Sequence, residues 1–154
     1  MPGEDSSFIA THPPRPEVFI FDYSKQPTQP PSDGVCRPLL KLKGHQKDGY
    51  GLSWNPLKKG LLASGADDGI VCVWDVDANT SAALSKTAQE VDAKYLMAGH
   101  DKQVVEDVCW NYYNDSLLAT CGDDKNVCLW DLRNVSSSSS SSSASPGRGV
   151  NILA

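Results

Sequence analysis

The chain has 154 residues, the length of one ordinary domain, and 40% of them are hydrophobic while 21% are charged. This balance argues against a disordered chain, and the formal net charge of −5 argues against direct binding to nucleic acid, which usually needs a basic face. No apolar run reaches the roughly 18 residues of a membrane span, and the acidic opening MPGEDSSFIA lacks the basic region of a signal peptide.

Residues 8–43 predict two short strands, a loop and a third strand. The apolar run at 8–11 and the alternating run ending in FIFDY at 19–23 are separated by a Pro-rich turn. The loop that follows holds four prolines, and PLLKLKGH then leads into a Gly-His pair. The Phe21-Asp22 pair stands where later segments carry Trp-Asp, so we expect this segment to be a related unit.

The middle of the chain contains an internal repeat. Its two Gly-His pairs stand 55 residues apart, and its two Trp-Asp pairs stand 56 apart. Between them, LLASGADDGIVCVWDV (61–76) aligns without a gap with LLATCGDDKNVCLWDL (117–132). The shared LLA, DD and VCxWD indicate that one structural unit occurs twice.

Each unit predicts four strands and no convincing helix, with TAQEVDAKYL (87–96) as the one segment where a helix is the alternative. YGLSW and EDVCW are aromatic and apolar runs, LLAS and LLAT are short buried runs, and IVCVWDV and NVCLWDL carry β-branched residues and tryptophan. The Asp-Asp steps between the second and third runs are typical of turns. A further run, PLLKLKGH or KYLMAGH, leads into each Gly-His pair, and residues 77–93 predict a polar insertion at the edge of the unit.

The composition changes after Arg133. Residues 135–149 are rich in serine and have almost no apolar content, so we expect a flexible linker. The alternative is an insertion without a role. Residues 150–154 predict the start of a further strand.

The cysteines and histidines predict neither a metal site nor a cofactor. The five cysteines are an odd number, none stands in a C-x-x-C pair, and the three histidines are far apart. Cys72 and Cys128 alternate with apolar residues in strand-like runs. We therefore expect both to be small buried hydrophobic residues in a reducing compartment.

The repeated unit resembles a blade of the WD40 β-propeller, which is a four-stranded sheet. This resemblance implies an all-β fold in which residues 1–134 form a partial propeller. One complete blade at about 50–98 is expected between a remnant at 8–43, which lacks its first strand, and an incomplete blade at about 104–134, which lacks its last. Because open ends leave strands and faces unpaired, we expect the chain to be a piece of a longer protein and marginal or aggregation-prone alone.

The resemblance also implies a buried polar network in each blade. There, an indole N–H, an imidazole, a hydroxyl and a carboxylate satisfy one another. A hydrolase triad is the alternative interpretation, but the set occurs twice and no G-x-S-x-G elbow is present, so we predict no enzyme. The two sets are His45, Ser64, Asp68 and Trp74, and His100, Thr120, Asp124 and Trp130.

Several longer sequence segments resemble one group of WD40 proteins. FDYSKQP, GHQKDGYGLSW, VDAK, VVEDVCW and GVNILA stand in the order found in histone-binding WD40 proteins related to the retinoblastoma-binding proteins and to the small subunit of chromatin assembly factor 1. The similarity covers about residues 8–134 and resumes at 150–154. It implies a seven-bladed nuclear propeller without catalytic activity, shared by chromatin assembly, deacetylase, remodelling and Polycomb complexes.

By the same resemblance, Asp48, Tyr50 and Glu106 belong to an acidic top face that binds the histone H3 tail and similar basic peptides. Carboxylates accept charge-assisted hydrogen bonds from arginine or lysine, and a tyrosine ring packs against aliphatic stems. The alternative is that the three are ordinary polar loop residues. Two departures from the family bear on this face, since its members carry Glu where Asp48 stands and an acidic residue where Gly149 stands.

The expected function is therefore a nuclear scaffold of chromatin complexes, with neither direct nucleic-acid binding nor membrane attachment. Histone H4 is an expected partner of the full-length protein only, because the N-terminal helix and late acidic loop that hold it in the family are absent from this sequence. The main alternative is a generic WD40 adaptor of a non-chromatin complex, such as a ubiquitin-ligase substrate receptor. An enzyme, or a chain with no function of its own, are the remaining alternatives.

Overall fold

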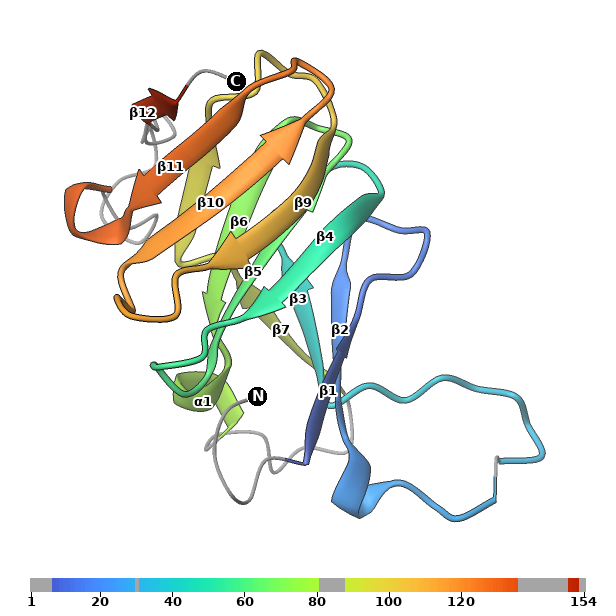
Figure 1. The fold of residues 1–154 in the computed structure, drawn as a ribbon. Helices are drawn as coiled ribbons and strands as arrows, with labels where there is room; N and C mark the ends of the chain where they lie inside the picture. Colours follow the sequence, from blue (N-terminus) through green and yellow to red (C-terminus); the bar gives the residue numbers. More distant parts are fainter. Residues whose placement is uncertain (1–6, 30, 81–87, 136–149, 153–154) are drawn as a thin grey trace.

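Three four-stranded β-sheets packed face to face make up the structure, a computed structural model that describes residues 7–29, 31–80, 88–135 and, by their backbone alone, 150–152 (Figure 1). Within these residues, one short helix, α1 (Val76–Thr80), and two 3-10 turns, Tyr23–Lys25 and Leu132–Asn134, lie between the strands. The all-β expectation is confirmed. None of the helices in the described part of the chain is long and apolar enough to cross a membrane.

The first sheet has the order β1 (Phe8–Thr11), β2 (Val18–Asp22), β3 (Leu40–Lys43) and β7 (Gln89–Asp92). The first three strands are antiparallel neighbours, whereas β7 pairs with β3 in parallel. We expected the segment that contains β7 to be a polar insertion, but it returns from the second unit to the outer edge of β3. There Val91 joins the buried cluster of the first sheet, and Glu90 pairs with Lys43.

The second sheet has the order β4 (Gly49–Trp54), β5 (Leu61–Ala66), β6 (Ile70–Asp75) and β8 (Tyr95–Ala98). All its neighbours are antiparallel. Every residue of β5 is buried. Since successive side chains of a strand point to opposite faces, this pattern shows that neighbouring sheets cover both faces of the second sheet.

The third sheet has the order β9 (Val105–Trp110), β10 (Leu117–Gly122), β11 (Val127–Asp131) and β12 (Val150–Ile152). We expected residues 150–154 to begin a further strand, and Val150–Ile152 do form one. This strand, β12, pairs antiparallel with β11 and supplies the last strand that we expected the third unit to lack. The outer edge of β11 offers unpaired backbone donors and acceptors to such an extended segment. Most of the serine-rich segment expected as a linker lies outside the described residues.

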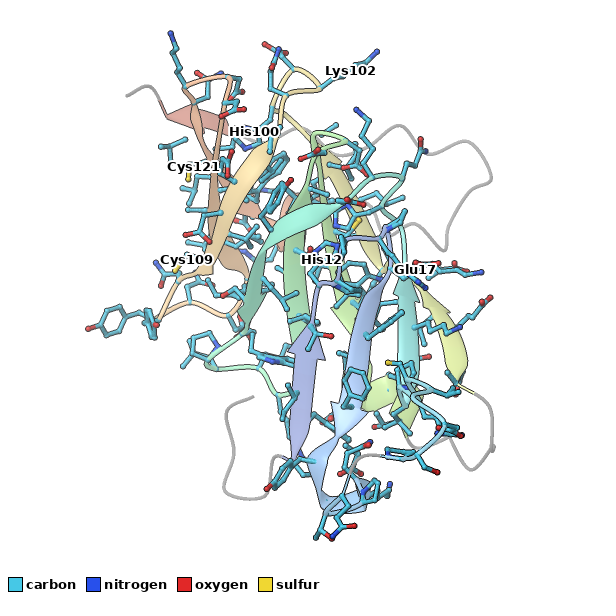
Figure 2. The ribbon with its side chains drawn as sticks, turned by 90° about the vertical axis from the view of Figure 1, so that its right-hand side faces the viewer. His12, Glu17, His100, Lys102, Cys109 and Cys121 are labelled. Atoms are coloured by element: carbon cyan, nitrogen blue, oxygen red, sulfur yellow. The ribbon has the colours of Figure 1, made fainter. Side chains whose placement is uncertain are left out.

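Two hydrophobic clusters join the three sheets. One unites Leu62, Cys72 and Trp74 of the second sheet with the first sheet, and the other unites the opposite face of the second sheet with the third. Cys72 and Cys128 are buried, as expected. Cys109 and Cys121 are exposed on the third sheet (Figure 2). Within the described residues the sheets do not close into a ring, so the outer faces of the first and third sheets have no neighbouring sheet.

Candidate functional site

The innermost strands of the second and third sheets begin at the same end of the molecule. β4 and β9 contact each other, and Figure 1 shows both arrows pointing the same way. Asp48 directly precedes β4, while Tyr50 and Glu106 are the second residues of β4 and β9. The structure therefore places all three predicted peptide-binding residues along one edge, which we call the top rim.

A β-bulge carries Tyr50, and another carries Glu106. The β4–β5 register shifts between Gly49 and Leu52, and the β9–β10 register leaves Glu106 without a partner between Val105 and Asp107. A bulge releases a side chain from the regular alternation of the ladder. Tyr50 is accordingly 60% exposed, and Glu106 is exposed as well.

The bulges make Glu106 the structural equivalent of Tyr50. Trp54 and Trp110 end β4 and β9, and each bulge residue stands four positions before its tryptophan. The position of Asp48 is taken in the third sheet by Val104. Counting from the histidines obscures this relation, because the loop after His100 is longer than the loop after His45 by one residue. Counting back from the tryptophans reveals it.

The structure adds a carboxylate that the sequence did not single out. The Asp67 amide donates a hydrogen bond of 2.9 Å to the Asp48 carbonyl, which brings Asp67 to the top rim beside Asp48. The Asp123 amide makes the matching bond of 3.0 Å to Val104. The first aspartate of each Asp-Asp turn thus belongs to the rim, and this doublet is the signal that could have found Asp67. Lysines also occupy the neighbouring turns, at Lys47, Lys102 and Lys125.

Glycine allows the two inner strands to approach each other. A Cβ atom added at Gly51 would lie 3.0 Å from both Asp107 Cα and Val108 N. The Trp110 indole N–H also donates a hydrogen bond of 3.0 Å to the Ser53 carbonyl. Glycine within a strand is typical of such close backbone contact. These contacts set the separation of the two bulges, and hence of Tyr50 and Glu106.

The third sheet contains the full polar network that the sequence predicts. His100 lies 2.9 Å from Asp124 through Nδ1 and 2.7 Å from the Thr120 hydroxyl through Nε2. The Trp130 indole N–H donates a hydrogen bond of 2.9 Å to the same hydroxyl. The side chain of His100 is fully buried (Figure 2), so this network satisfies polar atoms that water does not reach.

In the second sheet only two of the four predicted residues hydrogen-bond to each other, although the Trp74 ring lies 5.8 Å from the His45 ring between centroids. His45 Nδ1 lies 3.3 Å from both oxygens of Asp68. The Ser64 hydroxyl is instead 3.1 Å from Nδ1 of His12, and the Trp74 indole N–H donates to the Lys43 carbonyl at 2.9 Å. The prediction that Ser64 and Trp74 join this network is therefore wrong. His12, which follows a strand of the first sheet, lies within hydrogen-bond distance of the Ser64 hydroxyl in place of His45.

Burial shifts the pKa of His12. Burial itself and the neighbouring His45 lower the pKa from 6.5 to about 4, against the opposing effect of Asp48 and Asp68. Asp68 and Asp124 each keep a pKa below the usual value although burial alone would raise it, because His45 and His100 hydrogen-bond to their carboxylates.

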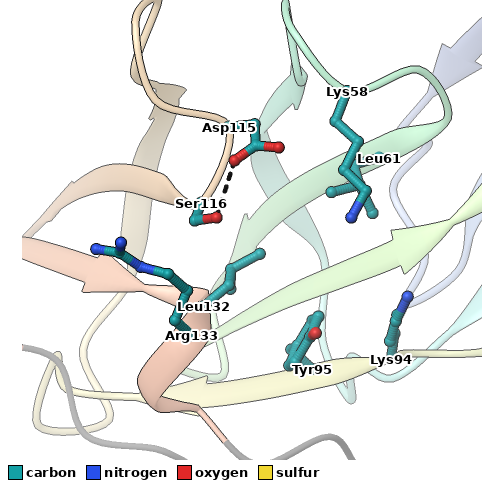
Figure 3. Close-up of a pocket in the computed structure, with 8 residues that line it drawn as sticks. All are labelled: Lys58, Leu61, Lys94, Tyr95, Asp115, Ser116, Leu132 and Arg133. Atoms are coloured by element: carbon teal, nitrogen blue, oxygen red, sulfur yellow. Dashed lines mark hydrogen bonds between the residues drawn. The ribbon is translucent and has the colours of Figure 1, made fainter.

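A small pocket lies at the opposite end of β4 and β9 from the top rim (Figure 3). Its volume is about 210 Å³, and Leu61, Tyr95 and Leu132 contribute apolar walls. Two of its cations are already paired, since Lys94 contacts Asp75 at 3.0 Å and Arg133 contacts Asp131 at 2.6 Å. Among the described residues, no group of three His, Cys, Asp or Glu side chains is placed to hold a metal ion.

The two networks predict unequal costs for removing the same hydroxyl. Thr120→Ala leaves the buried His100 and Trp130 nitrogens without a partner, so we expect it to lower the free energy of unfolding by about 2–4 kcal/mol. Ser64→Ala removes one bond to His12, and we expect a loss of about 1 kcal/mol. Urea unfolding followed by tryptophan fluorescence measures both losses. Equal losses would contradict the two arrangements.

The lowered pKa of His12 predicts a pH dependence of stability. In the unfolded chain His12 becomes protonated below about pH 6.5, whereas in the folded chain it becomes protonated only near pH 4. The free energy of unfolding is therefore highest above pH 6.5 and falls as the pH is lowered from 6.5 to 4. We expect an extra loss on the order of 2 kcal/mol relative to His12→Ala, allowing for partial exposure. Urea midpoints from pH 7 to 4 measure it, and parallel curves for the two proteins would rule it out.

Comparison with known proteins agrees with this architecture. Residues 36–75 and 93–131 each match the family WD40, described as WD domain, G-beta repeat, and together they cover just over half of the chain. The first match contains β3, β4, β5 and β6, and the second contains β8, β9, β10 and β11. Each match therefore joins one strand of a sheet to the first three strands of the next.

A solved structure has the same fold. A chain in the crystal structure of a mitotic checkpoint complex is similar with a TM-score of 0.60 and 22% identity, over 84% of the present chain and 33% of that chain. At this identity the likeness concerns the fold alone, and the present chain spans a third of that chain's length. The matched repeats and the stacked four-stranded sheets establish that this chain belongs to the WD40 family of β-propeller proteins.

Proposed function

We propose that this WD40 protein is a non-enzymatic scaffold that binds basic peptides, above all the histone H3 tail, at its top rim. The observation that carries this proposal is the convergence of Asp48, Tyr50 and Glu106 on one edge from two adjacent strands. A single extended peptide crossing from β4 to β9 would meet the carboxylates of Asp48 and Glu106 and the ring of Tyr50, with Asp67 beside Asp48.

The rim carboxylates are free to accept a ligand's cations. Neither Asp48, Asp67 nor Glu106 forms an ion pair within the part of the chain that the structure describes. Some carboxylates elsewhere are already paired with a cation, as in the pairs Glu90–Lys43 and Asp131–Arg133. A carboxylate without an internal partner is available to form a charge-assisted hydrogen bond with an arginine or lysine of the ligand.

The exposed ring of Tyr50 supplies the apolar part of the site. Its 60% exposure leaves a face available to the aliphatic stem or the cationic head of a long basic side chain. The combination of ring and carboxylates favours a peptide in which arginine or lysine alternates with smaller residues. The net charge of −5 favours such a partner over nucleic acid.

The sequence segments around the rim favour a function in chromatin. GHQKDGYGLSW and VVEDVCW, which resemble the histone-binding group, are the segments that carry the three rim residues. We accordingly propose a nuclear protein whose partners are histone H3 and subunits of chromatin complexes. An adaptor of another complex is the second candidate, because the similar solved chain belongs to a mitotic checkpoint complex. Affinity capture followed by mass spectrometry separates the two by the presence or absence of histones and deacetylase subunits.

Reversing one rim charge tests the proposal. We expect Glu106→Lys to weaken binding of a fluorescent H3-tail peptide at least about tenfold, measured by anisotropy at low and physiological salt, because the peptide then meets a like charge. We also expect added salt to weaken the wild-type complex.

Asp115→Lys is the matched control. Asp115 is exposed and lies in the loop at the other end of β9, so the substitution changes the net charge equally without touching the rim. We expect it to change the affinity less than about twofold, as for charges remote from an interface. Equal weakening by both substitutions would show non-specific attraction and overturn the rim as the binding site.

A further inference from the structure

We propose that His12 is a positioning residue of the top rim, which holds the Asp48–Tyr50 stretch in place for the peptide; this inference rests on the proposed function. His12 comes from the turn that follows β1 in the first sheet and points into the second sheet (Figure 2). It would act on the ligand through the backbone that it supports, without touching the ligand itself.

The imidazole of His12 lies against the backbone at the centre of the site. A Cβ atom added at Gly49 would stand 1.9 Å from His12 Cε1 and 2.5 Å from its Nδ1. Gly49 is the residue between Asp48 and Tyr50, and it opens the bulge that turns Tyr50 outward. The ring therefore occupies the space that any side chain at Gly49 would need, and it supports the strand where the rim begins.

A hydrogen bond fixes the ring to the next strand of the same sheet. His12 Nδ1 lies 3.1 Å from the hydroxyl of Ser64, which is fully buried in β5. The His12 and His45 rings stand 5.6 Å apart between their centroids. One side chain of the first sheet thus spans β4 and β5 of the second, directly below the Asp48–Asp67 pairing.

Among the residues that the structure describes, none is inserted at the corresponding place in the third sheet. Val105 occupies the position of Gly49, and Thr120 makes its contact with His100 of its own unit. The half of the rim that holds Glu106 is therefore supported from within its sheet, whereas the half that holds Tyr50 depends on His12. This difference between two repeats of one chain provides an internal control.

The arrangement leaves two buried nitrogens without a partner. Nε2 of His12 and Nε2 of His45 form no hydrogen bond among the described residues. An unsatisfied buried polar atom lowers stability, and departures from local satisfaction concentrate at functional sites. A residue that positions a binding surface at the expense of stability has this signature.

A double-mutant cycle on the whole chain tests the proposal through peptide binding. We expect His12→Ala to weaken H3-tail binding about fivefold alone and in the Glu106→Gln background, but less than twofold in the Tyr50→Ala background, since interacting sites are not additive. A general loss of stability would reduce binding equally in both backgrounds, and that result would overturn the proposal. If the alanine variant does not fold, His12→Asn, which keeps a polar atom near the Nδ1 position, enters the same cycle.

Amide hydrogen exchange gives a readout that needs no peptide. We expect His12→Ala to speed exchange at Gly49 and Tyr50 at least about tenfold while Val108 and Cys109 change less than twofold, because only the first half of the rim loses its support. Equal acceleration in both strands, or none at Gly49, would overturn the positioning role. Failure of the wild-type chain to bind the peptide, with this exchange pattern intact, would refute the proposed function and leave the role of His12 in shaping the rim supported.

Discussion

The close approach of β4 to β9 is the constraint on which the rest of the structure depends. Gly51 has no side chain to hold the strands apart, and the indole N–H of Trp110 in β9 donates a hydrogen bond to the Ser53 carbonyl of β4. Because both strands begin at the same end, this contact brings two bulges to one rim. The bulges then expose Tyr50 and Glu106, whose chemistry suits a basic peptide. The contact between β4 and β9 thus involves the sequence segments that resemble the histone-binding group, and it positions the candidate site.

The two repeats reach different solutions with the same residue types. In the third sheet, His100, Thr120, Asp124 and Trp130 satisfy one another. In the second sheet, His12 from outside the repeat contacts the Ser64 hydroxyl, and the Trp74 indole N–H donates a hydrogen bond to the Lys43 carbonyl. A repeated motif therefore specifies which polar groups are buried, while the neighbouring sheet decides how they pair. The polar network of the third sheet is therefore complete within its own repeat, whereas that of the second sheet includes His12 from the first.

Local patterns in the sequence predicted the strands well, because alternating apolar residues and Asp-Asp turns act over a few residues. Gly-His and Trp-Asp spacing predicted the repeat. The resemblance to WD40 blades implied two polar networks, of which the third sheet forms one in full and the second sheet forms only the His45–Asp68 contact. The return of β7 to β3 and the pairing of β12 with β11 depend on partners far away in the chain, which no local pattern encodes. His12 had no signal for the same reason: its importance comes from Gly49 and Ser64 across a sheet boundary. The equivalence of Tyr50 and Glu106 could have been found by aligning Trp54 with Trp110.

The central claim is that the starts of β4 and β9 form one binding surface, and a nuclear magnetic resonance titration with an H3-tail peptide tests it most directly. The account predicts that the amides of Tyr50 and Glu106 shift together along the titration with a single dissociation constant. Asp115, at the far end of β9, should not shift. Shifts confined to one of the two strands, or centred on Asp115, would contradict the account.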